Sequence, residues 1–134
     1  MKTFILNYFL FLLCLFLLPF NTFAADPVSI NATAEGVAVI VDNNTALARD
    51  QAVKDALRMV VEQTVGTMIS SETVVESYEV LQDQIYSKTQ GYIRNYNIIN
   101  ESPDENLYRV TIQANVAKGV LKNDLMALGL LIAR

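Results

Sequence analysis

The residues best suited to chemistry are the carboxylates of one short polar stretch. Glu101, Asp104 and Glu105 follow one another closely, and carboxylate oxygens are ligands that Ca²⁺ prefers. A calcium loop of the EF-hand kind needs oxygen ligands at alternate positions, a central glycine and a distal glutamate. This stretch lacks that spacing and contains Pro103. We therefore expect a solvated hairpin turn over residues 100–106 and no metal site.

Nucleophilic catalysis is disfavoured by what surrounds the serine pair Ser70-Ser71. The sequence has no histidine, and no Ser-x-x-Lys spacing supplies another base at this pair. Helix capping is therefore the better interpretation of the pair. We expect no catalytic residue and no enzyme, and a carboxylate-only site that uses Glu35 or Asp50 is the third and weakest hypothesis.

Three tyrosines fall on two segments that look like paired strands. Tyr92, Tyr96 and Tyr108 would form a stacking platform for nucleic-acid bases if basic residues surrounded them. Only Arg94 and Arg109 are nearby in the sequence. Cross-strand packing is therefore the expected role of the tyrosines.

Charge and composition narrow the partners further. The formal net charge is −4 with no basic patch, which excludes nucleic acid and anionic membrane surfaces as favoured partners. Arg94 and Arg109 are instead expected to pair with Glu35 or with an acid of a partner protein. With no histidine and one cysteine, the usual zinc and copper ligand sets are absent, and we expect no cofactor.

The N-terminus has the pattern of a secretory signal peptide. Lys2 precedes an apolar run over residues 8–18, and Pro19 breaks it before a stretch of small residues. Cleavage between Ala24 and Ala25 places small residues at positions −1 and −3. We therefore predict a cleaved signal peptide over residues 1–24 and an exported mature domain over 25–134.

Two alternatives to cleavage are less favoured. A retained anchor needs about 20 uninterrupted apolar residues, and Asn7 and Pro19 leave too few. A lipoprotein needs a small residue before its cysteine, whereas Leu13 precedes Cys14 inside the apolar run. Without Cys14 the mature chain has no cysteine, so we expect a bacterial periplasmic protein that is free of the membrane. The Asn-x-Ser/Thr matches at Asn31, Asn43 and Asn100 are then chance matches.

The element that organises the mature chain is an amphipathic helix predicted over residues 44–66. Its apolar positions recur every three or four residues, the 44–45 region offers an N-cap, and Gly66 suits a C′ position. The predicted buried stripe consists of Ala46, Val53, Ala56, Leu57, Val60, Thr64 and Val65.

The remaining elements supply a sheet and two further helices. Strict alternation predicts a strand over residues 28–41, in which Gly36 marks a bulge or a close backbone approach. The other expected elements are a helix over 72–88, with Ser70 or Ser71 as its cap, strands over 92–99 and 107–116, and a helix over 120–131. The alternative to two separate helices over 44–88 is one long helix with a kink at Gly66. The order β-α-α-β-β-α predicts an α+β two-layer sandwich, with the helices packed on an antiparallel sheet of about three strands.

Four stretches resemble the N-terminal domain of the flagellar assembly protein T family. They are AEGVA at 34–38, ARDQAVKDALR at 48–58, GYIR at 91–94 and YRVTI at 108–112. Together they imply that residues 28–131 share that fold. A helix of the A-R-x-x-A-x-x-x-A-L kind after a glycine-bearing strand also occurs in LPP20-like exported domains.

The resemblance implies a non-enzymatic periplasmic protein that takes part in building the rings of the flagellar basal body. Its partners would be basal-body or other periplasmic proteins. The rival hypothesis is a cell-envelope binding or maintenance module of the LPP20-like kind, unrelated to motility. Family members usually continue into further domains, so the apolar run at 128–132 predicts either a docking surface or a truncated product.

Overall fold

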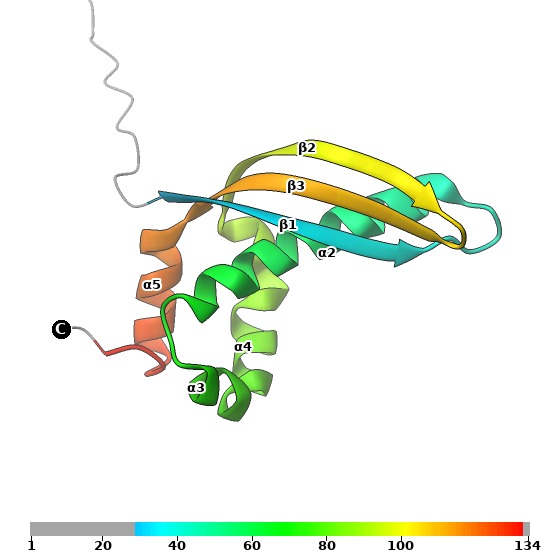
Figure 1. The fold of residues 1–134 in the computed structure, drawn as a ribbon. Helices are drawn as coiled ribbons and strands as arrows, with labels where there is room; N and C mark the ends of the chain where they lie inside the picture. The colour runs from blue at the N-terminus through cyan, green and yellow to red at the C-terminus, as the bar shows by residue number, and fades with distance from the viewer. Residues whose placement is uncertain (1–28, 133–134) are drawn as a thin grey trace, which may run out of the picture.

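The computed structural model describes residues 29–132 of the chain (Figure 1). The expected signal peptide, its Ala24–Ala25 cleavage site and Cys14 lie outside the described residues, as does Val28 at the start of the first predicted strand. Predictions about these positions therefore stay predictions.

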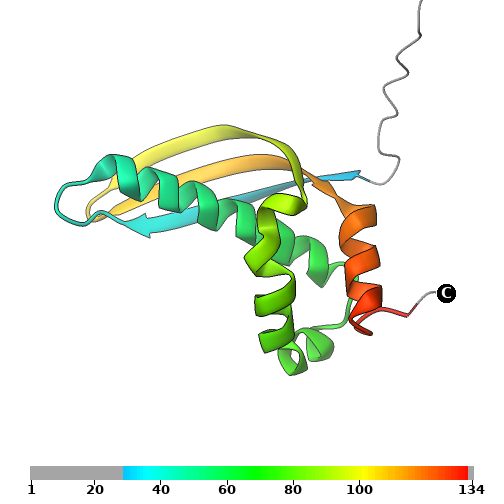
Figure 2. The same cartoon turned by 180° about the vertical axis from the view of Figure 1, so that it is seen from behind.

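Three antiparallel strands form one sheet in the order β1-β3-β2. Helix α2 runs along one face of this sheet, and the other helices gather at one end of it (Figures 1 and 2). The α+β class and the three-stranded antiparallel sheet are thus confirmed. The elements are β1 (Ser29–Val39), α2 (Thr45–Gly66), α3 (Ser71–Glu76), α4 (Tyr78–Gln84), the 3₁₀ helix η2 (Tyr86–Gly91), β2 (Ile93–Asp104), β3 (Leu107–Ala117) and α5 (Lys118–Ala127).

The core lies between the sheet and α2. Strand β3 is central and alternates as its sequence predicts, because one face meets α2 and the other meets solvent. The apolar residues at every second position of β3 are all buried: Tyr108, Val110, Ile112, Ala114 and Val116.

The buried face of α2 differs from the predicted stripe at four positions. Ala46 is exposed, and Ala48, Ala52 and Val61 are buried instead. Ala46 lies in the first turn of the helix, two residues before Ala48, which is the first buried residue of α2. Asn44 caps that turn as predicted, since its side chain accepts a hydrogen bond from the N–H of Leu47.

The single helix predicted over 72–88 is wrong. Ser77 adopts φ −105° and ψ 17°, which ends α3 and separates it from α4. The chain then turns through η2 to enter β2. Tyr78, the first residue of α4, is 55% exposed. Ser70 does cap α3, as its Oγ accepts from the N–H of Thr73 at 3.3 Å. Gly66 is the last residue of α2 and not the C′ residue beyond it.

The hairpin turn is much shorter than the predicted 100–106 segment. Strand β2 continues through Asp104, and Glu105 and Asn106 alone connect it to β3. Register shifts at Arg94 and Ile99 mark bulges, which change the face on which later side chains lie. Tyr92 precedes the strand altogether. Helix α5 also begins two residues early and ends at Ala127.

Candidate functional site

The first feature that positions functional side chains is the crossing of β1 and α2 at Gly36. A Cβ atom on Gly36 would lie 2.1 Å from the carbonyl oxygen of Ala52 and 2.3 Å from the backbone nitrogen of Ala56. No side chain fits in that space, so the glycine permits backbone contact. The β1–β3 register is unbroken there. The close approach predicted for Gly36 is therefore correct, and the bulge is not.

A polar contact joins the same two elements beside this crossing. The N–H of Val37 donates to Oδ2 of Asp55 at 3.0 Å, and Arg58 donates to Oδ1 of Asp55 at 2.9 Å. Arg58 also binds Glu62 one turn later. The pKa of Arg58 is raised, chiefly by its hydrogen bond to Asp55. Strand β1 lies at the edge of the sheet, where a strand of another molecule could pair with its free backbone groups. The hydrogen bond to Asp55 makes the N–H of Val37 unavailable for such pairing.

The carboxylates of the polar hairpin stretch bind arginines. Arg109 donates to Glu35 at 2.9 Å and to Asp104 at 3.0 Å, while Arg49 on α2 donates to Glu101 at 2.6 Å. The Arg109–Glu35 pairing confirms one predicted partner. Within residues 29–132, no cluster of acidic side chains has the geometry of a metal site.

The three tyrosines do not form a common platform. Tyr92 is buried and its hydroxyl donates to Oδ2 of Asp124 on α5 at 2.7 Å. Burial and this hydrogen bond raise the pKa of Tyr92. Tyr108 is buried in the core, whereas Tyr96 is 43% exposed. No sequence signal identified Asp124 as the partner of Tyr92, because the two lie on elements that are distant in the chain.

The residues of the carboxylate-only enzyme hypothesis lie on opposite sides of the sheet. Gly36 faces α2, so its neighbour Glu35 faces away from the helix layer. Asp50 is exposed on α2, on the other side of the sheet. A shared active site for these two carboxylates is therefore excluded by the fold.

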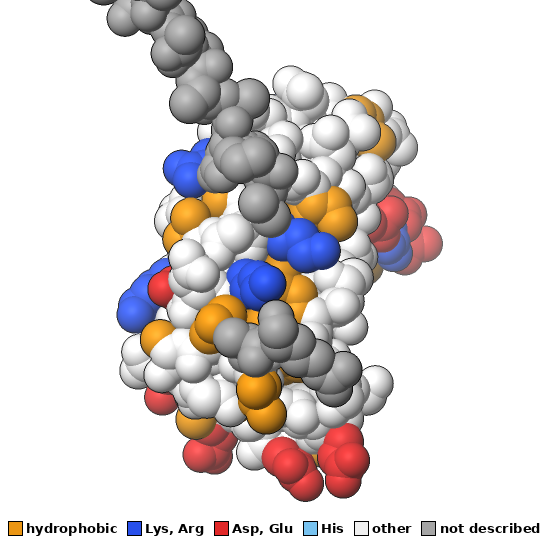
Figure 3. Space-filling view, turned by 90° about the vertical axis from the view of Figure 1, so that its left-hand side faces the viewer, with side chains coloured by type: hydrophobic (Ala, Val, Ile, Leu, Met, Phe, Trp, Pro, Cys, Tyr) orange, Lys and Arg blue, Asp and Glu red, His pale blue; other side chains and the backbone are white. Residues whose placement is uncertain are grey.

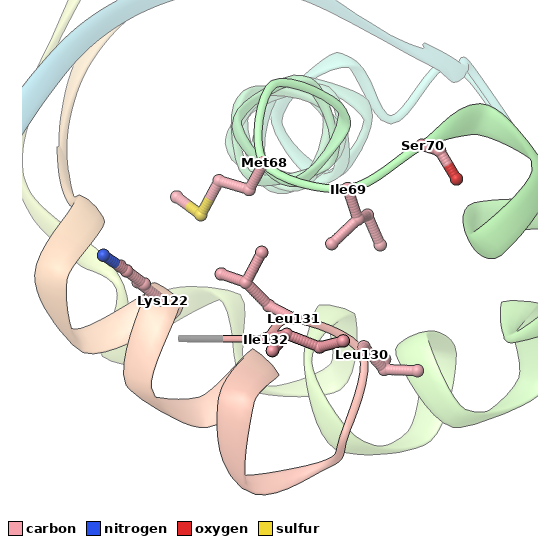
Figure 4. A pocket seen from close by; sticks show the side chains of 7 residues that line it. All are labelled: Met68, Ile69, Ser70, Lys122, Leu130, Leu131 and Ile132. Carbon is pink, nitrogen blue, oxygen red and sulfur yellow. The ribbon is translucent and has the colours of Figure 1, made fainter. Parts of the chain in front are cut away.

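A groove of about 460 Å³ lies at the end of the molecule where the smaller helices gather. We call it the end groove. Residues 68–70 between α2 and α3 form one wall, residues 130–132 form the other, and Lys122 of α5 completes it. In Figure 4 the side chains of Met68, Ile69 and Leu131 point toward one another across the groove.

The wall formed by residues 130–132 exists because α5 ends in a glycine cap. Gly129 has φ +73°, its N–H donates to the carbonyl of Met126, and the N–H of Leu130 donates to the carbonyl of Leu125. This Schellman arrangement turns the chain back on the helix. The apolar run at 128–132 thus lies against the core on one side and lines the groove on the other.

Charged side chains surround the end groove unevenly. Figure 3 shows Lys and Arg side chains beside the hydrophobic surface on this side of the molecule, and Asp and Glu side chains at its lower edge. Lys122 is exposed and lies on the groove itself. The groove is therefore apolar with a cationic border, a composition suited to a protein partner.

Comparison with known families places the described fold among flagellar proteins. The family model for flagellar assembly protein T, N-terminal domain, matches residues 31–118. No curated protein matches the chain. The matched residues run from β1 to the first residue of α5, so they include the Gly36 crossing and exclude one wall of the end groove. Across residues 29–132, none of the helices is both long enough and apolar enough to span a membrane.

Proposed function

The chain belongs to the family of flagellar assembly protein T N-terminal domains, and from this we propose that it is an exported, non-enzymatic factor in assembly of the basal-body rings. Membership implies involvement in flagellar assembly. The location, the absence of catalysis and action through protein contacts are the proposed parts.

The family match is the observation that carries the proposal. It covers the helix–sheet crossing at Gly36, the Asp55 contact and the whole of β3. These residues act by holding α2 against the sheet. Residues of this kind maintain the fold that the family shares, and they carry no chemistry. A protein built on this fold would therefore act by binding other proteins at its surface.

Two properties of the described residues support action without catalysis. Glu35, Glu101 and Asp104 are occupied by arginines on the surface. The end groove is apolar rather than lined with converging polar groups. Both favour binding of a protein over turnover of a substrate.

Export is supported by the sequence alone. We propose that residues 1–24 are a signal peptide cut between Ala24 and Ala25, which would release the mature chain to the periplasm. Removing those residues takes away Lys2 and changes the net charge from −4 to −5. N-terminal sequencing of the protein recovered from the periplasmic fraction tests this step, and a retained N-terminus would contradict it.

A gene deletion tests the function. The proposal expects loss of swimming and of normal flagella, and restoration when the full-length chain is expressed in trans. Normal motility together with an envelope-stress response would contradict it and favour the LPP20-like envelope module. A variant that is exported but unfolded, such as Ala56→Asp, is the matched control and should fail to restore swimming.

A further inference from the structure

The molecule carries a second exposed apolar surface next to the end groove. Helices α3 and α4 have no residue buried except Leu81. We call their exposed side chains the acidic helix surface. Its apolar members are Val75, Tyr78 and Val80, at 76%, 55% and 43% exposure, and its acidic members are Glu72, Glu76, Glu79 and Asp83.

The end groove and the acidic helix surface carry opposite charges. Lys118 and Lys122 lie four residues apart on α5, which places them on one side of that helix. Within the part of the chain that the structure describes, neither lysine forms an ion pair, and neither do the four acids of α3 and α4. Each surface thus has apolar side chains to bury and charges to neutralise.

We propose that two copies of this chain form a symmetric dimer in which the end groove of each copy receives the acidic helix surface of the other. Charge complementarity favours the acidic helix surface of a second copy as the surface that binds the end groove. It offers apolar side chains for the groove and carboxylates for Lys118 and Lys122. Tyr78 suits such a contact, since tyrosine is enriched at the centres of protein interfaces.

The position of the two surfaces favours a closed dimer over an open chain. Helices α3, α4 and α5 lie at the same end of the molecule (Figures 1 and 2). Residues 68–70, which line the groove, lead directly into α3. When two complementary surfaces are adjacent, one two-fold rotation brings both pairs together at once, which is how a self-complementary interface closes.

A pair of charge-reversed variants tests the dimer directly. One variant carries Lys118→Glu and Lys122→Glu, so that both of its surfaces are acidic. The other carries Glu72→Lys, Glu76→Lys and Glu79→Lys, so that both are basic. All five side chains lie outside the buried core, so we expect both proteins to fold, and circular dichroism checks this. The control is Lys54→Glu, an exposed change on α2.

Mass is then measured by analytical ultracentrifugation on protein recovered from cells that express the full-length chain. The wild type and Lys54→Glu should be dimers, and each reversed variant should dissociate at least about tenfold more readily. An equal mixture of the two reversed variants should recover the dimer, because both contacts become attractive again.

Three results would overturn the inference that the two surfaces bind each other, and a fourth would overturn its symmetry. The wild type could stay monomeric at all concentrations, or the charge-reversed variants could remain dimeric. The equal mixture of the two charge-reversed variants could also stay monomeric. Masses that grow beyond the dimer would show an open chain and would refute the two-fold arrangement. None of these measurements depends on motility, so they are separate from the test of the proposed function.

Discussion

The N–H of Val37 donates a hydrogen bond to Oδ2 of Asp55, 3.0 Å away, one residue beyond the point where Gly36 meets the backbone of α2. The crossing of β1 and α2 is thus held by backbone contact on one residue and by a charge-assisted hydrogen bond on the next. Two of the four family-like stretches meet here. The scaffold that would present the end groove depends on this junction.

The first prediction concerns the space at Gly36. Gly36→Ala should destabilise the protein by about 3 kcal/mol or more, because its Cβ would meet backbone atoms of Ala52 and Ala56 that cannot move without shifting α2. Urea denaturation measures the change. Gly66→Ala is the matched control, since no atom lies within 4 Å of its Cβ. It should leave stability unchanged or raise it by about 0.5–1 kcal/mol. Equal effects at the two glycines would contradict the close approach.

The second prediction concerns the Asp55 hydrogen bond. Asp55→Ala should lower the free energy of unfolding by about 1–2 kcal/mol, since it removes the acceptor for Val37 and a partner of Arg58. Asp50→Ala changes an exposed carboxylate on the same helix and should stay within about 0.5 kcal/mol of wild type. Hydrogen exchange adds a local readout, because the Val37 amide should exchange faster in Asp55→Ala alone.

The third prediction separates the true buried face of α2 from the one that periodicity suggests. Ala56 is fully buried, so Ala56→Asp should abolish cooperative thermal unfolding by placing an unpaired charge in the core. Ala46→Asp should stay within about 0.5 kcal/mol of wild type, because Ala46 is exposed in the first turn, where an acid is favoured by the helix dipole. Normal melting of Ala56→Asp would show that the assignment of the buried face is wrong.

The fourth prediction is a loss of stability at high pH. Burial, with a contribution from the charge of Glu62, raises the pKa of Tyr86 to about 12 from its ordinary value of 10.0. The folded state therefore holds this proton more tightly than the unfolded chain does. The resulting stabilisation is intact below about pH 10 and is lost as the pH rises toward about 12. Burial of Tyr92 and its hydrogen bond to Asp124 act in the same direction.

The variant Tyr86→Phe isolates this effect, because phenylalanine has no hydroxyl to titrate. Between about pH 9 and pH 11 the wild type should lose more stability than Tyr86→Phe in urea denaturation. Parallel losses in the two proteins would show that Tyr86 does not contribute.

The sequence pattern predicted those elements in which one face alone is buried. Strand β3 alternates between the core and solvent, so its apolar residues reveal its direction and its inward face. Helix α2 was located for the same reason. Its alanines were harder to place, because a side chain as small as that of Ala48 or Ala52 gives little periodic signal whether buried or exposed.

Other features depend on contacts between distant residues. The bulges of β2 at Arg94 and Ile99 fall in a stretch rich in asparagine, where neither face is strongly apolar and register is weakly marked. The Tyr92–Asp124 hydrogen bond joins the residue that follows η2 to α5. No pattern in the sequence around either residue predicts it. The end groove arises from the turn at Gly129, which brings the terminal apolar run back toward Met68 and Ile69.

The central claim, that this scaffold serves assembly of the basal-body rings, is tested most directly by imaging. Basal bodies would be isolated from the deletion strain, from the same strain expressing the wild-type chain, and from one expressing Gly36→Ala, and examined by electron microscopy. We predict rings that are missing or incomplete in the deletion strain, complete with the wild-type chain, and deficient with Gly36→Ala. Complete rings in the deletion strain would contradict the claim.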